Sequence, residues 1–114
     1  MPTAKPCPFC AILKGDEPGK IIARDDERKF ALIQSIHPGS VIHWLALPYE
    51  HTDSTEELER TDRERFLNLI EFAIRETRRA AAEHPELVRG FTMKLHFGSF
   101  ETLQHAKVHI VAVE

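Results

Sequence analysis

Residues 105–110 alternate strictly between polar and apolar side chains, and this pattern limits the possible fold more than any other feature. An alternation with a period of two predicts a β-strand that buries one face in the core. The apolar residues at even positions would enter that core, and the opposite face would carry His105, Lys107 and His109. Two imidazoles and an amine in a row could bind a metal ion or a phosphate group. An exposed polar face on an edge strand would show the same spacing.

The rest of the chain predicts an α+β domain. Runs rich in β-branched and aromatic residues lie between turn sequences and indicate strands, and two sequences with capping-box spacing begin at Ser54 and Thr61. The expected strands are 20–24, 29–34, 41–47, about 91–96 and 106–113, and the expected helices are 9–14, 54–59 and 62–83. Three strands, one main helix and two strands predict an antiparallel β-meander sheet with that helix on one face.

Length and composition limit the class of protein. A length of 114 residues suits a single domain, residues 1–114, and 42% hydrophobic with 29% charged residues is typical of a globular protein. The net charge of −3 gives no sign of nucleic-acid binding. No apolar run is long enough to span a membrane, and the first residues lack the apolar centre of a signal peptide, so a cytoplasmic location is expected.

Cys7 and Cys10 are the only cysteines, and they form a Cys-x-x-Cys pair. They lie too close together to cross-link a fold, which excludes a disulfide scaffold. Such a pair supplies half of a tetrahedral zinc site, which needs two more Cys or His ligands. A thioredoxin-like redox pair normally follows a strand, and none is predicted before Cys7. That alternative, and the alternative of two plain buried thiols, stay open.

Three segments together resemble the histidine-triad (HIT) family. Residues 105–111 resemble its His-φ-His-φ-His-φ-φ motif, in which φ is apolar, with Lys107 in place of the middle histidine. Residues 7–16 resemble the CxFCxIxxG opening of zinc-containing members, and residues 43–51 resemble the HxLVxPxxH segment. That segment contains the sequence His-Trp-Leu-x-Leu-Pro, which is similar to the aprataxin branch of the family. Residues 93–112 are similar to the same branch.

The resemblance implies a fold and a metal site. The family fold is an α+β meander whose sheet carries the triad beside a nucleotide pocket. In zinc-containing members, the histidine after the third strand and the first triad histidine complete a Cys₂His₂ site, and they match His51 and His105. Four ligands leave no open position, so this zinc would be structural. Family members often form dimers, which makes a homodimer an expectation by resemblance alone.

Two departures from the family concern catalysis. In HIT enzymes the central histidine attacks the α-phosphorus of a nucleotide and forms a nucleotidyl intermediate. Lys107 stands at that position, and a free lysine with a pKa of about 10.4 has about one neutral amine in 2,500 at pH 7. Ser35 stands where the family has an acidic residue that holds the ribose hydroxyls, and serine cannot make that bidentate contact.

Other pocket positions match the family. His109 matches the third triad histidine, which contacts the phosphate, Thr102 matches a hydroxyl residue that faces the phosphate, and His96 matches a polar residue at the rim. Turn chemistry at Thr102 and an exposed strand end at His96 are the alternatives. The expected function is binding of a nucleotide or another small phosphorylated ligand, with weak or lost nucleotidyl hydrolase activity. An active hydrolase or nucleotidyl transferase acting on nucleoside phosphoramidates or dinucleoside polyphosphates, and a structural or partner-binding domain, stay open.

Overall fold

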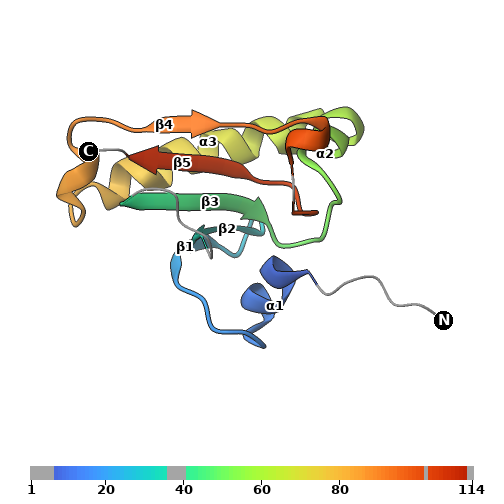
Figure 1. Cartoon of the computed structure of the whole chain (residues 1–114), viewed down its shortest axis with the longest axis horizontal. Coiled ribbons are helices and arrows are strands. Elements are labelled where there is room, and N and C mark those ends of the chain that lie inside the picture. Colours follow the sequence, from blue (N-terminus) through green and yellow to red (C-terminus); the bar gives the residue numbers. More distant parts are fainter. Residues whose placement is uncertain (1–6, 36–40, 102, 113–114) are drawn as a thin grey trace.

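The computed structural model describes residues 7–35, 41–101 and 103–112, and these form a five-stranded antiparallel sheet in the order β1-β2-β3-β5-β4 (Figure 1). The strands are β1 (Ile21–Asp25), β2 (Phe30–Gln34), β3 (Ile42–Pro48), β4 (Thr92–Lys94) and β5 (Val108–Ala112). The helices are α1 (Pro8–Lys14), α2 (Thr55–Thr61) and α3 (Arg63–Ala80), with short 3-10 turns η1 (Pro85–Leu87) and η2 (Gly98–Phe100). The predicted α+β class is confirmed. None of the described helices is both long and apolar enough to cross a membrane.

The strand β5 lies inside the sheet, between β3 and β4, so the alternative of an exposed edge strand is wrong. The strand begins at Val108, later than predicted, because the preceding chain bonds outside the sheet: the N–H of Ala106 donates to the carbonyl oxygen of Thr52 at 2.8 Å. His105 and Lys107 are 0% and 3% exposed. The polar row at the end of the chain is therefore largely interior.

The two predicted capping boxes have different outcomes. Ser54 caps α2 as predicted, because its Oγ accepts the N–H of Glu57 at 3.0 Å. The helix α3 is capped by Asp62, which accepts the N–H of Arg65 at 3.2 Å, rather than by Thr61. Asp62 takes this place because it is also the residue at which α2 ends, so one extended residue separates the two helices.

The helix α3 and the strand β4 are also shorter than predicted. The helix α3 ends at Ala80 instead of residue 83, and a turn then leads to Pro85. His84 has extended backbone angles (φ −135°, ψ 91°), as expected for the residue before a proline, which stops the helix early. The strand β4 covers only Thr92–Lys94, where it pairs with β5 at the edge of the sheet.

Two apolar clusters pack on opposite faces of the sheet. The cluster beneath α3 includes the even positions of β5, as predicted, together with Phe30, Trp44, Leu69 and Phe72. The cluster on the other face joins α1 to β2 and β3 through Phe9, Ile12, Ile33 and Leu45. Figure 1 shows α1 and α3 on different sides of β3. The cysteines of α1 therefore face the same side of the sheet as His109, whose partner across the β3–β5 ladder is Leu45.

Candidate functional site

The first site is a cluster of two cysteines and two histidines. Cys7 caps α1 and Cys10 lies in its first turn, so the helix presents both sulfur atoms together before it ends at Gly15, which has the left-handed φ of 85°. His51 follows β3 and His105 precedes β5, and these strands are neighbours. One ligand atom from each of the four residues lies within 4.8 Å of the others. The structure brings together all four residues predicted as metal ligands.

Hydrogen bonds donated by Nε2 of the two imidazoles hold each ring with its Nδ1 atom toward the sulfur atoms. His105 Nε2 lies 3.0 Å from the carbonyl oxygen of Pro48, and His51 Nε2 lies 2.8 Å from Oδ1 of Asp53. Both partners only accept hydrogen bonds, so Nε2 carries the hydrogen and Nδ1 of the neutral ring keeps its lone pair. Partners of this kind orient metal-binding histidines.

The spacing of the ligand atoms fits a tetrahedral ion. Cys7 Sγ lies 3.3 Å from His105 Nδ1. Cys10 Sγ lies 3.5 Å from Nδ1 of His51 and 3.7 Å from that of His105. Bonds of about 2.3 Å to sulfur and about 2.0 Å to nitrogen place tetrahedral zinc ligands about 3.6 Å apart. Burial and the neighbouring Cys7 thiol raise the pKa of Cys10 to about 11, so its thiolate form needs a cation beside it.

The second site is a cavity of about 190 Å³ on the face of the sheet that α1 covers. Four residues predicted for catalysis or ligand binding line it, namely Ser35, His96, Lys107 and His109. Thr102 lies outside the described residues. Apolar walls come from Phe9, Leu45, Phe100 and Leu103. Three larger grooves lie elsewhere. The groove of about 400 Å³ is lined by Cys10 and His51 of the first site, and none of the described residues predicted for a site lines the other two, of about 460 and 510 Å³.

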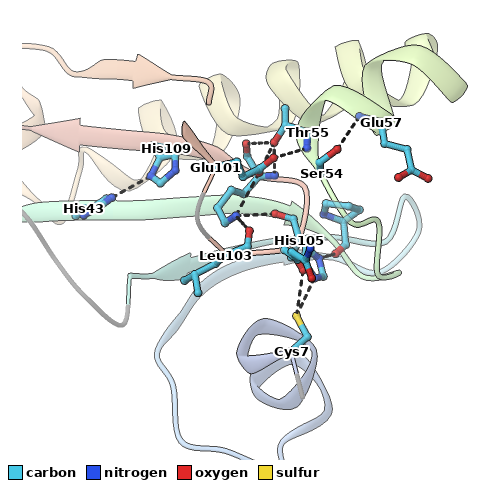
Figure 2. Close-up of polar contacts among 12 residues, drawn as sticks. Cys7, His43, Ser54, Thr55, Glu57, Glu101, Leu103, His105 and His109 are labelled. Atoms are coloured by element: carbon cyan, nitrogen blue, oxygen red, sulfur yellow. Dashed lines mark hydrogen bonds and ion pairs between the residues drawn. The ribbon is translucent and has the colours of Figure 1, made fainter. Parts of the chain in front are cut away.

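Lys107 directs its amine to acceptors inside the protein. Its Nζ donates to the carbonyl oxygens of Leu103 and His105, both at 2.7 Å, and lies 3.3 Å from a carboxylate oxygen of Glu101 (Figure 2). The exposed fractions of the Lys107 and Glu101 side chains are 4% and 3%. Three acceptors around one amine require three donated hydrogens, which is the ammonium form. Burial lowers the pKa of Lys107, and the Glu101 carboxylate opposes that shift.

Glu101 links Lys107 to the start of α2. Its carboxylate accepts the backbone N–H of Thr55 at 2.7 Å and the Thr55 hydroxyl at 2.6 Å (Figure 2). That hydroxyl in turn accepts the backbone N–H of Lys107 at 3.1 Å. The sequence analysis missed both Glu101 and Thr55. One signal was available, because Glu101 is the only acidic residue between positions 87 and 113.

Three histidines meet at the polar end of the cavity. His43 Nε2 lies 3.1 Å from His109 Nδ1, so one of these two atoms carries the hydrogen that they share. The ring of His96 packs edge-on against His109, with ring centroids 4.5 Å apart. Burial, followed by the charges of His96 and His43, lowers the pKa of His109 to about 4, and burial also lowers the pKa of His43. His43 and His109 are therefore neutral at pH 7 and suited to hydrogen bonding with an anionic group.

The sequence analysis assigned no site role to His43. It stands two residues before Leu45 on β3, and Leu45 pairs with His109 on β5. Residues two apart on a strand share a face, so the register of this strand pair predicts that His43 lies beside His109. That register was not available from periodicity alone.

Comparisons with known sequences identify the family of this chain. The profile of the family described as "Scavenger mRNA decapping enzyme C-term binding" matches residues 6–114. The adenosine 5′-monophosphoramidase HINT3 of Danio rerio is 27% identical over 108 residues, which cover 95% of this chain. The chain spans 65% of the length of that relative.

Comparisons with solved structures find histidine-triad proteins. A zinc-bound histidine triad family protein from Mycobacterium smegmatis is 31% identical with a TM-score of 0.79, and the match covers 95% of this chain and 75% of that one. A histidine triad protein from Clostridium difficile is 23% identical with a TM-score of 0.78 and coverage of 99% and 95%, a likeness of fold alone. With the family profile matching nearly the whole sequence, the chain belongs to the histidine-triad family.

Proposed function

We propose that this protein binds a nucleotide or another small phosphorylated ligand in the histidine-lined cavity and has weak or no nucleotidyl hydrolase activity. The observation that carries the proposal is the environment of Lys107, whose Nζ is engaged with three acceptors inside the protein. The residue stands where HIT enzymes have their nucleophilic histidine. A pocket that keeps its ligand-facing groups but lacks a nucleophile supports binding without turnover.

Lys107 lacks what nucleophilic attack requires. A nucleophile needs a free electron pair, which an ammonium group does not have. To gain one, Lys107 would have to lose a proton and give up a contact with Leu103, His105 or Glu101. A phosphoramidate formed on lysine would also be a poorer leaving group than one formed on imidazole, so turnover would stall after attack.

The cavity keeps groups suited to a phosphorylated ligand. His109 and His43 offer ring nitrogens, and Phe9 offers an apolar wall for an organic group. Ser35, 8% exposed, supplies a hydroxyl where the family has a carboxylate, so ribose hydroxyls would be held less firmly. Thr102 would add a phosphate contact on resemblance alone. The relative named as an adenosine 5′-monophosphoramidase supports a nucleotide as the ligand class.

We also propose that the ion of the Cys₂His₂ cluster is zinc. The ligand spacing, the tautomers of the two histidines and the zinc-bound mycobacterial relative support this identity. Cys7, Cys10, His51 and His105 would hold the ion with no position left for substrate. Its contribution would be to the folding free energy, because it would tie α1 to the sheet.

Calorimetric titration with AMP tests the binding function. We expect saturable binding, and we expect His109→Gln to lower the affinity about tenfold, which corresponds to the loss of a hydrogen bond to a charged group. His84→Gln is the matched control, since His84 packs against Trp44 in the core on the α3 face. A folded protein that does not bind AMP would favour the structural or partner-binding alternative.

Incubation with adenosine 5′-phosphoramidate and dinucleoside polyphosphates tests the lost activity. Product analysis and intact-mass spectrometry should show little or no turnover and no covalent adduct. Turnover in the usual enzyme range of about 1–10³ per second would contradict the proposal. A nucleotidyl adduct on Lys107 would favour the transferase alternative.

A further inference from the structure

We propose that Glu101 is a positioning residue that determines which side chain position 107 can hold: its buried carboxylate requires a cation there and disfavours the neutral imidazole used by HIT enzymes. The pairing of the two residues stands on the structure alone. Only the conclusion that Glu101 accounts for the absence of a nucleophilic histidine at position 107 rests on the proposed function.

The surroundings of Glu101 explain why it needs a cation. Its side chain is 3% exposed, and both carboxylate oxygens are engaged, one with the N–H and the other with the hydroxyl of Thr55. A buried carboxylate is strongly unfavourable unless an opposite charge accompanies it. Within the part of the chain that the structure describes, Lys107 is the cationic side chain that lies within 4 Å of it.

Imidazole cannot replace the Lys107 amine in this position. The amine donates to Glu101 and to the carbonyl oxygens of Leu103 and His105, whereas neutral imidazole has one N–H to donate. A histidine introduced alone would leave the carboxylate without its counter-charge and at least one buried carbonyl oxygen unpaired. Glutamine at position 101 has nearly the same shape and carries no charge. Its oxygen can accept the N–H of Thr55, and its amide group can donate to the Thr55 hydroxyl, which has a second acceptor in the backbone carbonyl oxygen of residue 107 at 3.1 Å. The two positions must therefore change together.

The first test is a double-mutant cycle on the metal-loaded protein, with wild type, E101Q, K107H and E101Q/K107H unfolded by urea. We expect K107H to lower the folding equilibrium constant at least about tenfold more with Glu101 present than with E101Q. The exposed pair Glu56–Arg60 is the control, and its cycle of E56Q and R60H should show coupling of about twofold. If K107H does not fold and E101Q/K107H does, the coupling is shown directly.

The second test asks whether releasing position 107 restores covalent chemistry. Each variant is incubated with adenosine 5′-phosphoramidate and weighed by intact-mass spectrometry. In the reaction sought, a ring nitrogen at position 107 bonds to phosphorus, the phosphorus–nitrogen bond of the phosphoramidate breaks, and the amino group leaves as ammonia after taking a proton from water. We expect an adduct in E101Q/K107H at ten or more times the yield in K107H, a difference that a purely structural role would not produce among folded variants.

Several outcomes would overturn the proposal. Additive effects of the two substitutions on stability, or an E101Q/K107H variant that does not fold, would show that Glu101 does not determine the side chain at position 107. Equal adduct yields in the two histidine variants would do the same, and so would the absence of adduct from both when they are folded. Titration of the wild type with AMP tests the proposed function separately. If the wild type does not bind AMP but Glu101 and Lys107 are strongly coupled, the proposed function is wrong and the role of Glu101 stands.

Discussion

The carbonyl oxygen of His105 accepts a hydrogen bond from Nζ of Lys107 at 2.7 Å, while Nδ1 of the same His105 lies 3.3 Å from the sulfur of Cys7. One residue therefore connects the Cys₂His₂ cluster to Lys107, which lines the cavity. His105 is fully buried, and the Pro48 carbonyl holds the far side of its ring. A shift of His105 toward one site disturbs the other, so we expect changes at the cluster to be measurable in the cavity.

Removal of the proposed zinc should lower both stability and AMP affinity. Freshly purified protein should contain one zinc per chain, and a strong chelator should lower the melting temperature by at least about 10 °C, which corresponds to roughly 2 kcal/mol in a domain of this size. Cys10→Ser should reproduce the loss of stability and of AMP affinity, whereas His84→Gln should keep its zinc and its AMP affinity. If the purified protein contains no zinc and the chelator leaves its melting temperature unchanged, the proposed zinc site is wrong.

Thr55→Val should destabilise the protein through its buried contacts. The substitution removes the hydroxyl that donates to Glu101 and accepts the N–H of Lys107, while it keeps the shape of the side chain. We expect the free energy of unfolding in urea to fall by about 1–3 kcal/mol, because buried polar groups lose their partners. Thr61→Val, at an exposed residue whose hydroxyl donates to the Glu57 carbonyl oxygen, should change it by less than about 0.5 kcal/mol. Equal effects would contradict this account.

Acid should destabilise the protein partly through His109. The folded protein keeps this imidazole neutral down to a pKa of about 4, whereas the unfolded chain takes up a proton near 6.5. The unfolded state therefore binds more protons between these values, so the contribution of His109 to stability is present above about pH 6.5 and is lost as the pH falls toward 4. His109→Gln should lose less stability than wild type between pH 7 and pH 5, as measured by urea midpoints. If wild type and His109→Gln lose the same stability between pH 7 and pH 5, His109 does not have this role.

Arg65 should contribute to the stability of the segment that carries His51. Its guanidinium donates two hydrogen bonds to the carboxylate of Glu50, at 2.6 and 2.8 Å. The guanidinium lies 4.5 Å from the ring centroid of Phe30. It also donates to two carbonyl oxygens between β1 and β2. Lysine keeps the charge but loses this planar fork, so Arg65→Lys should lower the free energy of unfolding by about 1–2 kcal/mol.

The comparison for this prediction is Arg63→Lys, at an exposed ion pair with Glu59. That change should stay within about 0.5 kcal/mol of wild type. Matching losses in the two variants, measured by urea unfolding, would mean that the fork of Arg65 adds nothing beyond its charge.

Periodicity and local spacing predicted the fold class and the two cysteines of the Cys₂His₂ cluster, whereas His51 and His105 were assigned from the resemblance to the HIT family. Alternation reports which face of a strand is buried, and Cys-x-x-Cys on a helix start fixes two ligands by local geometry. The same alternation overextended β5, because residues 105–107 keep the pattern while Ala106 bonds outside the sheet. A periodic pattern cannot show where hydrogen bonding to a neighbouring strand stops.

The polar network around Lys107 could not be predicted in this way. Glu101 is a single acidic residue in a loop, and its burial depends on Thr55, which is 46 residues away in the sequence. Likewise, the contact of His43 with His109 depends on the register between two strands 66 residues apart. Such contacts follow from tertiary packing, which one sequence does not reveal.

The position of Phe9 has a consequence for the N-terminal region. This residue is fully buried, its ring stands edge-on to that of His105 with centroids 5.8 Å apart, and it also lines the ligand cavity. The apolar cluster beneath α3 contains no residue of α1. Proteolytic trimming after Gly15 would therefore spare that apolar cluster, yet it would remove two of the four residues of the Cys₂His₂ cluster and open one wall of the cavity in a single cut. Both sites therefore depend on an intact α1.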